Sequence, residues 1–167
     1  MRGLLSPSRA FSLVASPPAT PRRCRVLDLD PQWEKDPGFV MYDFNKPLEL
    51  PEEILGKFAM VVVDPPFITR DVYEKYKVRA RCLFSRPAER LLTAPHPPQT
   101  TIEALLAPGG KILISTVNEN VEMLAELFPG VERRPFQPSI PNLVYQYNLY
   151  TSYPSERMMQ LNPEIPQ

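Results

Sequence analysis

An uninterrupted apolar run at Phe58–Val63 (FAMVVV), which ends abruptly at Asp64-Pro65-Pro66, restricts the fold of this chain more than any other feature. A strand with one face in water alternates apolar and polar residues, so a run without alternation is typical of a parallel strand covered on both faces. Proline has no backbone N–H to donate, and the two prolines therefore end the strand. The run predicts a sheet with helices packed on it, because parallel strands need crossover connections that are usually helical.

The rest of the chain alternates strand-like and helix-like segments. Short strands are predicted at 25–29, 39–44 and 111–116, and a helix is predicted at 119–128, where apolar residues recur at helical spacing. The chain has 22 prolines among 167 residues, which excludes an all-helical bundle because interior prolines break helices. We predict an α/β fold with an open, mostly parallel sheet, whose ligands would bind at the carboxyl ends of the strands.

The last strand-like segment, at 143–153, alternates apolar and polar residues and so differs from the buried strands. A strand at 131–136 could pair with it, which predicts an antiparallel hairpin at the edge of the sheet. The residues predicted to share one face of the later strand are Leu143, Tyr145, Tyr147, Leu149 and Tyr153.

Two segments differ in composition from the rest of the chain. Residues 1–27 carry five arginines and no acid, residues 78–99 carry four arginines, and the remaining 118 residues have a net charge of −8. If residues 78–99 are left out, the apolar positions on either side join into one continuous amphipathic helix, so these residues are interpreted as an insert. The segment 1–24 is interpreted as disordered or unrelated to the domain. Its arginine- and serine-rich composition also allows an organellar transit peptide.

Asp64-Pro65-Pro66-Phe67 is the strongest candidate for chemistry, because an acidic or amide side chain followed by two prolines and an aromatic, directly after an apolar strand, is typical of methyltransferases that act on nitrogen. The Asp64 carboxylate and the Pro65 carbonyl can each accept a hydrogen bond from an amine, and the prolines hold that carbonyl in place. Phe67 can cover the amine by stacking or by a cation–π interaction. The alternative is an ordinary strand end followed by a proline-rich loop, with Phe67 in the core.

Acidic and aromatic residues at two other strand ends are candidates for cofactor binding. Asp28 and Asp30 follow the first predicted strand, and an acid at the second strand end of a dinucleotide-type fold typically binds ribose hydroxyls. Asp43 and Phe44 close the next strand, where they could contact an adenine ring. Each pair also has an ordinary interpretation, as a solvated strand end and as a turn.

The runs FVMYDFNKPLELPEEILGKFAMVVVDPPF, GGKILIST and NLVYQYNLYTSY resemble the eukaryotic elongation factor 1-alpha lysine methyltransferases, formerly called N6-adenine-specific DNA methyltransferase 2. The resemblance implies a Rossmann-like class I fold and transfer of a methyl group from S-adenosylmethionine to a lysine of the elongation factor. It covers residues 25–154 apart from the insert, so that span is taken as a partial methyltransferase domain, followed by a tail at 155–167. Carried over by position, Asp64 through Phe67 would bind the amine, and Asp28, Asp43 and Phe44 would bind the cofactor. Nothing in 1–24 resembles the family's first strand and its small-residue cofactor loop, which are therefore expected to be missing.

Two other functions stay open at this point. The motif also suits an adenine methyltransferase that acts on nucleic acid, although a charge of −8 suits a basic protein target better than phosphates. The chain could instead be an inactive fragment of the family. We expect a monomer in the cytoplasm without a membrane segment, and no metal site, because Cys24, Cys82 and His96 form no ligand cluster.

Overall fold

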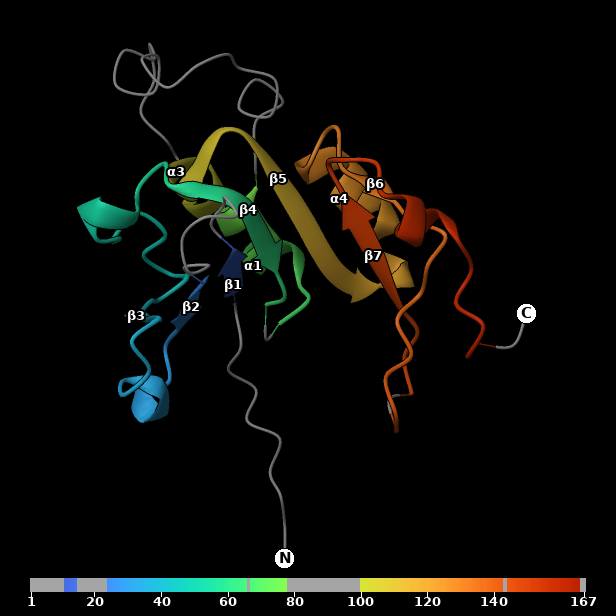
Figure 1. Ribbon diagram of the computed structural model, residues 1–167, viewed down its shortest axis with the longest axis horizontal. Helices are drawn as coiled ribbons and strands as arrows, with labels where there is room; N and C mark the ends of the chain where they lie inside the picture. Colours follow the sequence, from blue (N-terminus) through green and yellow to red (C-terminus); the bar gives the residue numbers. More distant parts are fainter. Residues whose placement is uncertain (1–10, 15–23, 66, 78–99, 143, 166–167) are drawn as a thin grey trace, which may run out of the picture.

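A seven-stranded sheet in the order β3-β2-β1-β4-β5-β7-β6 forms the centre of the computed structural model (Figure 1). The structure describes residues 11–14, 24–65, 67–77, 100–142 and 144–165. The strands are β1 (Phe11–Val14), β2 (Cys24–Asp28), β3 (Phe39–Met41), β4 (Phe58–Val63), β5 (Leu106–Val117), β6 (Glu132–Arg133) and β7 (Tyr147–Thr151). The helices are α1 (Arg70–Tyr76), α3 (Thr101–Leu105) and α4 (Val121–Leu127), with 3-10 turns η1 (Pro31–Trp33), η2 (Glu52–Ile54), η4 (Asn118–Asn120) and η5 (Glu156–Met159).

The predicted buried strand at 58–63 is β4, which pairs in parallel with β5. Its alternate residues Val61 and Val63 are fully buried, whereas Met60 and Val62 are only half-buried. The prediction that both faces are covered was therefore wrong for the described part of the chain. The three helices lie behind the sheet in Figure 1, and the core forms on that side, where the rings of Tyr73 and Phe128 meet edge to face at 6.1 Å.

Strand β1 lies between β2 and β4, at the position where a first strand was expected to be missing. It runs antiparallel to both neighbours, with Phe11 opposite Leu27 on one side and Val63 on the other. Within the described residues, no strand parallel to β2 and β4 lies at this position. The expectation that the segment 1–24 is disordered or unrelated to the domain needs correction, because four of its residues form a strand in the sheet. This strand pairs with backbone groups of β2 and β4 that would otherwise lack hydrogen-bond partners.

The continuous helix predicted across the insert is instead two short helices, α1 and α3. Their ends adjoin, because the Thr100 hydroxyl donates to the carbonyl oxygen of Lys77 at 2.5 Å. The backbone of Lys77 has left the helical region, with φ −46° and ψ 159°, and this ends α1. The residues on either side of the insert are therefore neighbours, as predicted, although one helix does not run through them.

The C-terminal hairpin is confirmed, since β6 and β7 pair antiparallel and β7 also pairs antiparallel with β5. Tyr147 and Leu149, which were predicted to share one face of β7, are both half-buried, whereas Asn148 and Tyr150 between and after them are buried. Asn148 is buried at no loss of hydrogen bonding, because Gln137 donates to its Oδ1 at 2.9 Å and its Nδ2 donates to Asn118 at 3.3 Å.

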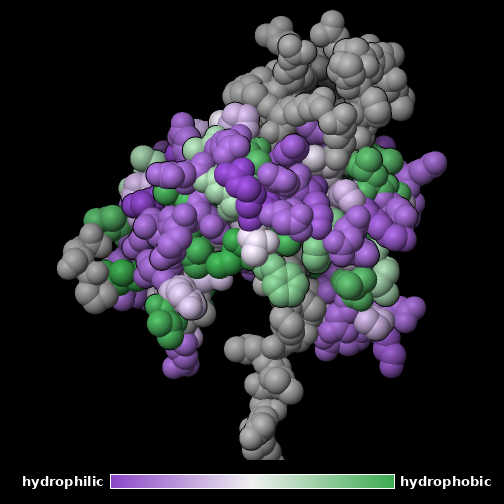
Figure 2. Space-filling model, turned by 180° about the vertical axis from the view of Figure 1, so that it is seen from behind, coloured by the Kyte–Doolittle hydropathy of each residue, from purple (hydrophilic) through white to green (hydrophobic). Residues whose placement is uncertain are grey.

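The described part of the predicted tail, residues 155–165, packs on this hairpin. The Phe136 N–H donates to the Met158 carbonyl at 3.1 Å, and the buried Asn162 donates from Nδ2 to the Gln137 carbonyl at 2.8 Å. None of the helices in the described part of the chain has the length and hydrophobicity needed to span a bilayer. Seen from behind, the surface is mainly hydrophilic, with smaller hydrophobic patches (Figure 2).

Candidate active site

The strand ends singled out in the sequence meet at one edge of the sheet. Strands β2 and β4 are both antiparallel to β1, so they point in the same direction, and β3 and β5 are parallel to them. Their carboxyl ends therefore lie together, at the lower edge of the sheet in Figure 1. This is the edge at which open α/β sheets bind their ligands.

Asp64 is the first residue after β4 and has solvent-exposed surface. Its carboxyl is nevertheless partly desolvated, and this burial raises its pKa above the ordinary value of 3.8. Pro65 is buried, Phe67 is 57% exposed, and Pro66 lies outside the described residues. The motif thus exposes an acid and an aromatic ring to solvent, on backbone that strand β4 holds in place, as the amine-binding hypothesis requires.

The aromatic rings predicted for two different roles are in contact. The Phe44 and Phe67 rings meet edge to face, with centroids 6.5 Å apart and an interplanar angle of 67°. The ammonium of Lys75 lies 5.0 Å from the Phe44 centroid, and it also donates to Asn45 Oδ1 at 3.0 Å and to Asp71 at 2.9 Å. The cation–π contact that was proposed for Phe67 is therefore made by its neighbour Phe44, with an internal lysine.

The predicted cofactor acids lie at this edge but differ in accessibility. Asp28 ends β2 and is only 1% exposed, and its Oδ1 accepts the Asp30 N–H at 2.9 Å. Asp43 follows β3, where its Oδ1 accepts from the backbone N–H of Asn45 at 2.8 Å and so caps a turn. The structure brings Phe44 to Phe67, and it gives no direct contact of Asp28 or Asp43 with Asp64.

The sequence interpretation missed two residues at this edge. The Nδ2 of Asn120, in η4, donates to the Ile68 carbonyl and to the Thr116 hydroxyl, both at 2.9 Å, and so ties the segment after the motif to the end of β5. The pKa of Tyr147 is raised by burial and by the negative charge of Asp64, which places the start of β7 within electrostatic reach of the motif. Polar residues directly after an apolar strand were the signal that could have identified Asn120.

A family model described as "Probable N6-adenine methyltransferase" matches residues 4–155. The chain belongs to this family. It is 33% identical to EEF1A lysine methyltransferase 1 of Mus musculus over 119 residues and 30% identical to that of Homo sapiens, each covering 70% of this chain and 44% of the relative. It is 43% identical over 63 residues to Protein-lysine N-methyltransferase EFM5 of Saccharomyces cerevisiae, covering 36% of this chain and 25% of the relative. No solved structure matches.

Family membership confirms the predicted Rossmann-like methyltransferase fold, and the mixed sheet agrees with it. The resemblance to elongation factor lysine methyltransferases is also confirmed by these relatives. The chain spans less than half the length of the curated relatives it matches. The family model begins at residue 4, earlier than the resemblance noted in the sequence.

A methyltransferase of this family uses S-adenosylmethionine, and the described residues fit that cofactor only in part. Asp28 and Phe44 lie at the expected strand ends for ribose and adenine, but the burial of Asp28 leaves its carboxylate little access to a ribose. The position of the first strand is held by an antiparallel strand, and in the described ranges no glycine-rich turn leads from it into a helix. The residues expected to bind the amine, Asp64 and Phe67, are therefore more accessible than Asp28, which was expected to bind the cofactor.

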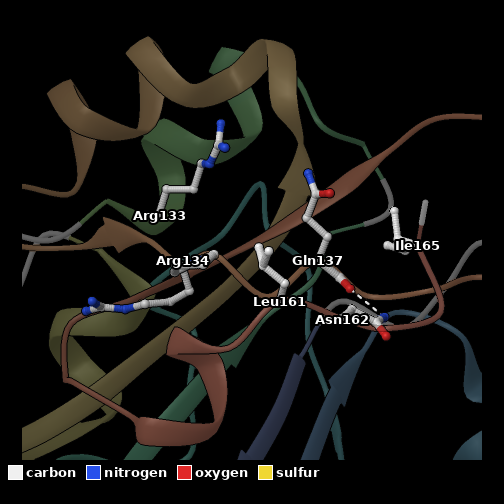
Figure 3. A pocket seen from close by; sticks show the side chains of 7 residues that line it. Arg133, Arg134, Gln137, Leu161, Asn162 and Ile165 are labelled. Carbon is white, nitrogen blue, oxygen red and sulfur yellow. Dashed lines mark hydrogen bonds between the residues drawn. The ribbon is translucent and has the colours of Figure 1, made fainter. Parts of the chain in front are cut away.

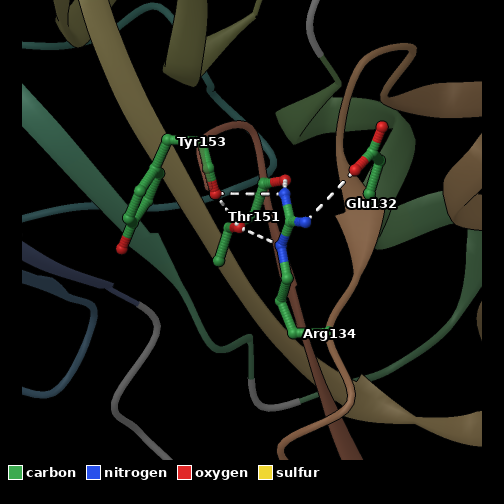
Figure 4. Close-up of polar contacts among 4 residues, drawn as sticks. All are labelled: Glu132, Arg134, Thr151 and Tyr153. Carbon is green, nitrogen blue, oxygen red and sulfur yellow. Dashed lines mark hydrogen bonds and ion pairs between the residues drawn. The ribbon is translucent and has the colours of Figure 1, made fainter. Parts of the chain in front are cut away.

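A buried arginine fixes the C-terminal side of the family domain, away from the motif (Figure 4). The Arg134 guanidinium donates to the Thr151 hydroxyl at 2.6 Å and to the carbonyl oxygens of Thr151 and Tyr153 at 3.1 and 3.0 Å. It also pairs with Glu132 at 3.2 Å. All of these partners lie on β6, β7 or just after it, so Arg134 holds the hairpin together rather than binding a ligand.

A pocket of about 330 Å³ lies between this hairpin and the tail, not at the motif (Figure 3). It is lined by Arg133, Arg134, Pro135, Gln137, Leu161, Asn162 and Ile165. The two guanidinium groups extend in different directions, and Gln137 and Asn162 are joined by the hydrogen bond drawn there. The two positive charges that line the pocket therefore do not converge on one point. Among the described residues, no group of His, Cys, Asp and Glu could hold a metal ion.

Proposed function

We propose that this protein is a protein-lysine N-methyltransferase that uses S-adenosylmethionine and acts on translation elongation factor 1 alpha. The observation that carries the proposal is the contact between the Phe44 ring and Phe67 of the motif that begins at Asp64. The ammonium of Lys75 lies over the Phe44 ring. The printed names of the relatives, which are lysine methyltransferases, support the same choice. We expect a monomer acting in the cytoplasm.

The roles of the residues follow from hydrogen bonding and charge. The cofactor supplies a methyl group on a positively charged sulfur. Asp64 would accept a hydrogen bond from the lysine amine, the Pro65 carbonyl would accept a second, and the remaining lone pair would be directed at the methyl group. Desolvation raises the pKa of Asp64, which makes its carboxylate a stronger hydrogen-bond acceptor. Phe67 would cover the amine and exclude water from it.

An adenine substrate is the second candidate, and it is favoured by the description of the family model. The same two acceptors could hold an exocyclic amine. A nucleic-acid substrate requires basic surface for its phosphates, whereas the family-like part of the chain has a net charge of −8. Charge therefore favours a basic protein target.

The deciding experiment measures transfer of tritium from labelled S-adenosylmethionine to purified elongation factor 1 alpha and, separately, to duplex DNA. We expect label in the elongation factor and none in DNA, and Asp64→Ala should reduce transfer by about 10²-fold or more. Label in DNA alone would replace the lysine proposal with the adenine one. Calorimetry with S-adenosylmethionine on the same chain tests the cofactor side, and weak binding is expected because Asp28 is buried. No transfer together with no measurable binding would identify an inactive fragment.

A further inference from the structure

The described residues between β6 and β7, 135–142 and 144–146, are here called the edge loop, and they project past the carboxyl edge of the sheet (Figure 1). It contains no charged residue and has prolines at positions 135, 138 and 141. Proline fixes backbone φ, so the loop loses little conformational entropy when it binds a partner. In Figure 2 the loop forms a projection at the lower margin that carries hydrophobic surface.

Strand register places the end of this loop beside the motif. Tyr147 pairs with Val117, whereas Val63 of the neighbouring strand pairs with Ile114, so β5 and β7 extend three residues past the end of β4. The charge of Asp64 reaches Tyr147, as its effect on the tyrosine pKa indicates. Residues that precede Tyr147 therefore lie beyond the level of Asp64, on the side from which a substrate would approach.

The base of the edge loop is held by hydrogen bonds on both sides. Gln137 donates to Asn148 in β7 and accepts from Asn162 in the tail, and Phe136 donates to Met158. The tip, in contrast, exposes large apolar side chains, with Val144 93% exposed and Tyr145 66% exposed. A loop that is anchored at its base and exposes an aromatic and an aliphatic side chain at its tip has the composition of a binding surface, because such residues contribute to binding when a partner buries them.

We propose that the edge loop and Phe67 together bind the polypeptide residues that flank the target lysine, with apolar side chains of the substrate packing on Val144 and Tyr145. The inference rests on the proposed function and adds the surface that selects the substrate. Charge favours a basic polypeptide, since Asp64 and Glu119 lie at this edge and the loop offers no cation to a phosphate. The Arg133 guanidinium, in the neighbouring strand β6, already donates to Asn118 Oδ1 at 3.0 Å.

The test compares the affinity of elongation factor 1 alpha for three forms of the full chain by biolayer interferometry. The double variant Val144→Ser/Tyr145→Ser should bind roughly tenfold more weakly than the unchanged chain, because it removes apolar surface from the tip. The control Met159→Ser/Leu161→Ser removes apolar residues that are 55% and 57% exposed on the tail, and should bind like the unchanged chain. Thermal melting of all three should agree, because every substituted side chain is exposed.

Methyl transfer, measured in parallel, separates this inference from the proposed function. Equal affinity of the two double variants would overturn the docking surface even if the elongation factor is methylated. A selective loss of affinity without methyl transfer by the unchanged chain would support the surface and reject the proposed activity. If the unchanged chain does not bind the elongation factor, the docking surface assigned to it is overturned as well.

Discussion

At the scale of single residues, the Asp64 carboxylate lies where its ionised form lowers the stability of the folded protein. Asp64 is partly desolvated, and its raised pKa means that folding disfavours its ionised form. An aspartate that only capped a turn would be expected to have a lowered pKa, because hydrogen bonds and opposite charges favour the carboxylate. The position of Asp64 is therefore better explained by a ligand that it must bind than by the stability of the loop.

Asp64→Asn should increase the stability of the protein at pH values above the raised pKa of Asp64, and it should slow methyl transfer less than Asp64→Ala does, because the amide oxygen can still accept a hydrogen bond from the amine. The asparagine carries no charge to desolvate, whereas the ionised aspartate lowers stability at every pH above its raised pKa. As the pH falls through that pKa towards 3.8, the aspartate takes up a proton and the difference between the variants should disappear. Urea denaturation at a series of pH values measures this, and a stability gap that grows on acidification would contradict it.

Asn120→Asp tests the tie between β5 and the segment that follows the motif. The substitution replaces the Nδ2 donor with a carboxylate oxygen that faces the Ile68 carbonyl, so the segment should open, at a cost of about 1–3 kcal/mol. Hydrogen exchange should become faster in the peptide covering residues 67–70. Asn118→Asp is the matched control, because the Oδ1 of Asn118 acts as an acceptor and the substitution keeps an acceptor there. Equal exchange in both variants would remove the positioning role of Asn120.

At the scale of elements, the sequence predicted what depends on neighbouring residues. Strand β4 and its end at the motif follow from an apolar run and two prolines, and both were found where expected. The full burial of Asn148 was not predicted, because its partners Gln137 and Asn118 come from distant parts of the chain. The direction of β1 was not predicted either, since a short strand pairs in the direction that its long-range neighbours allow.

Within the candidate site, too, the sequence predicted features that depend on neighbouring residues and missed those that depend on distant ones. The sequence identified Asp64 and Phe67, which are adjacent to a strong strand signal. It assigned Phe44 to the cofactor and did not predict its contact with Phe67 or with Lys75, since these rings and the ammonium meet only when three segments of the chain are folded together.

The hairpin of β6 and β7 should depend on Arg134 far more than on its neighbour. Arg134→Met keeps an unbranched side chain but removes the guanidinium donors to the Thr151 carbonyl and hydroxyl and leaves the Tyr153 carbonyl with the Thr151 hydroxyl alone, and we expect a loss of about 2–3 kcal/mol in the free energy of unfolding. Arg133→Met should change it by less than about 0.5 kcal/mol, because Arg133 is an exposed residue. Urea denaturation measures both, and similar losses in the two variants would contradict the role given to Arg134.

At the scale of the whole molecule, the insert at 78–99 should be dispensable for folding. Lys77 and Thr100 are hydrogen-bonded to one another, so a two-residue Gly-Ser link can replace the 22 residues between them. Shortening the loop lowers its closure entropy, and the shortened chain should be more stable by about 1–2 kcal/mol. Thermal melting provides the measurement. A large decrease in stability would mean that residues 78–99 contribute to the fold.

The direction of β1 has a practical consequence for handling the protein. A first strand parallel to its neighbours enters the sheet at the edge opposite the site, whereas this one enters at Phe11, level with Val63 and therefore next to Asp64. An affinity tag fused to the amino terminus is thus attached through ten residues to the ligand edge, while the tail reaches the surface beside the C-terminal hairpin. Purification tags, fluorophores and surface-immobilisation handles belong at the carboxyl terminus, where they leave the approach to the motif clear.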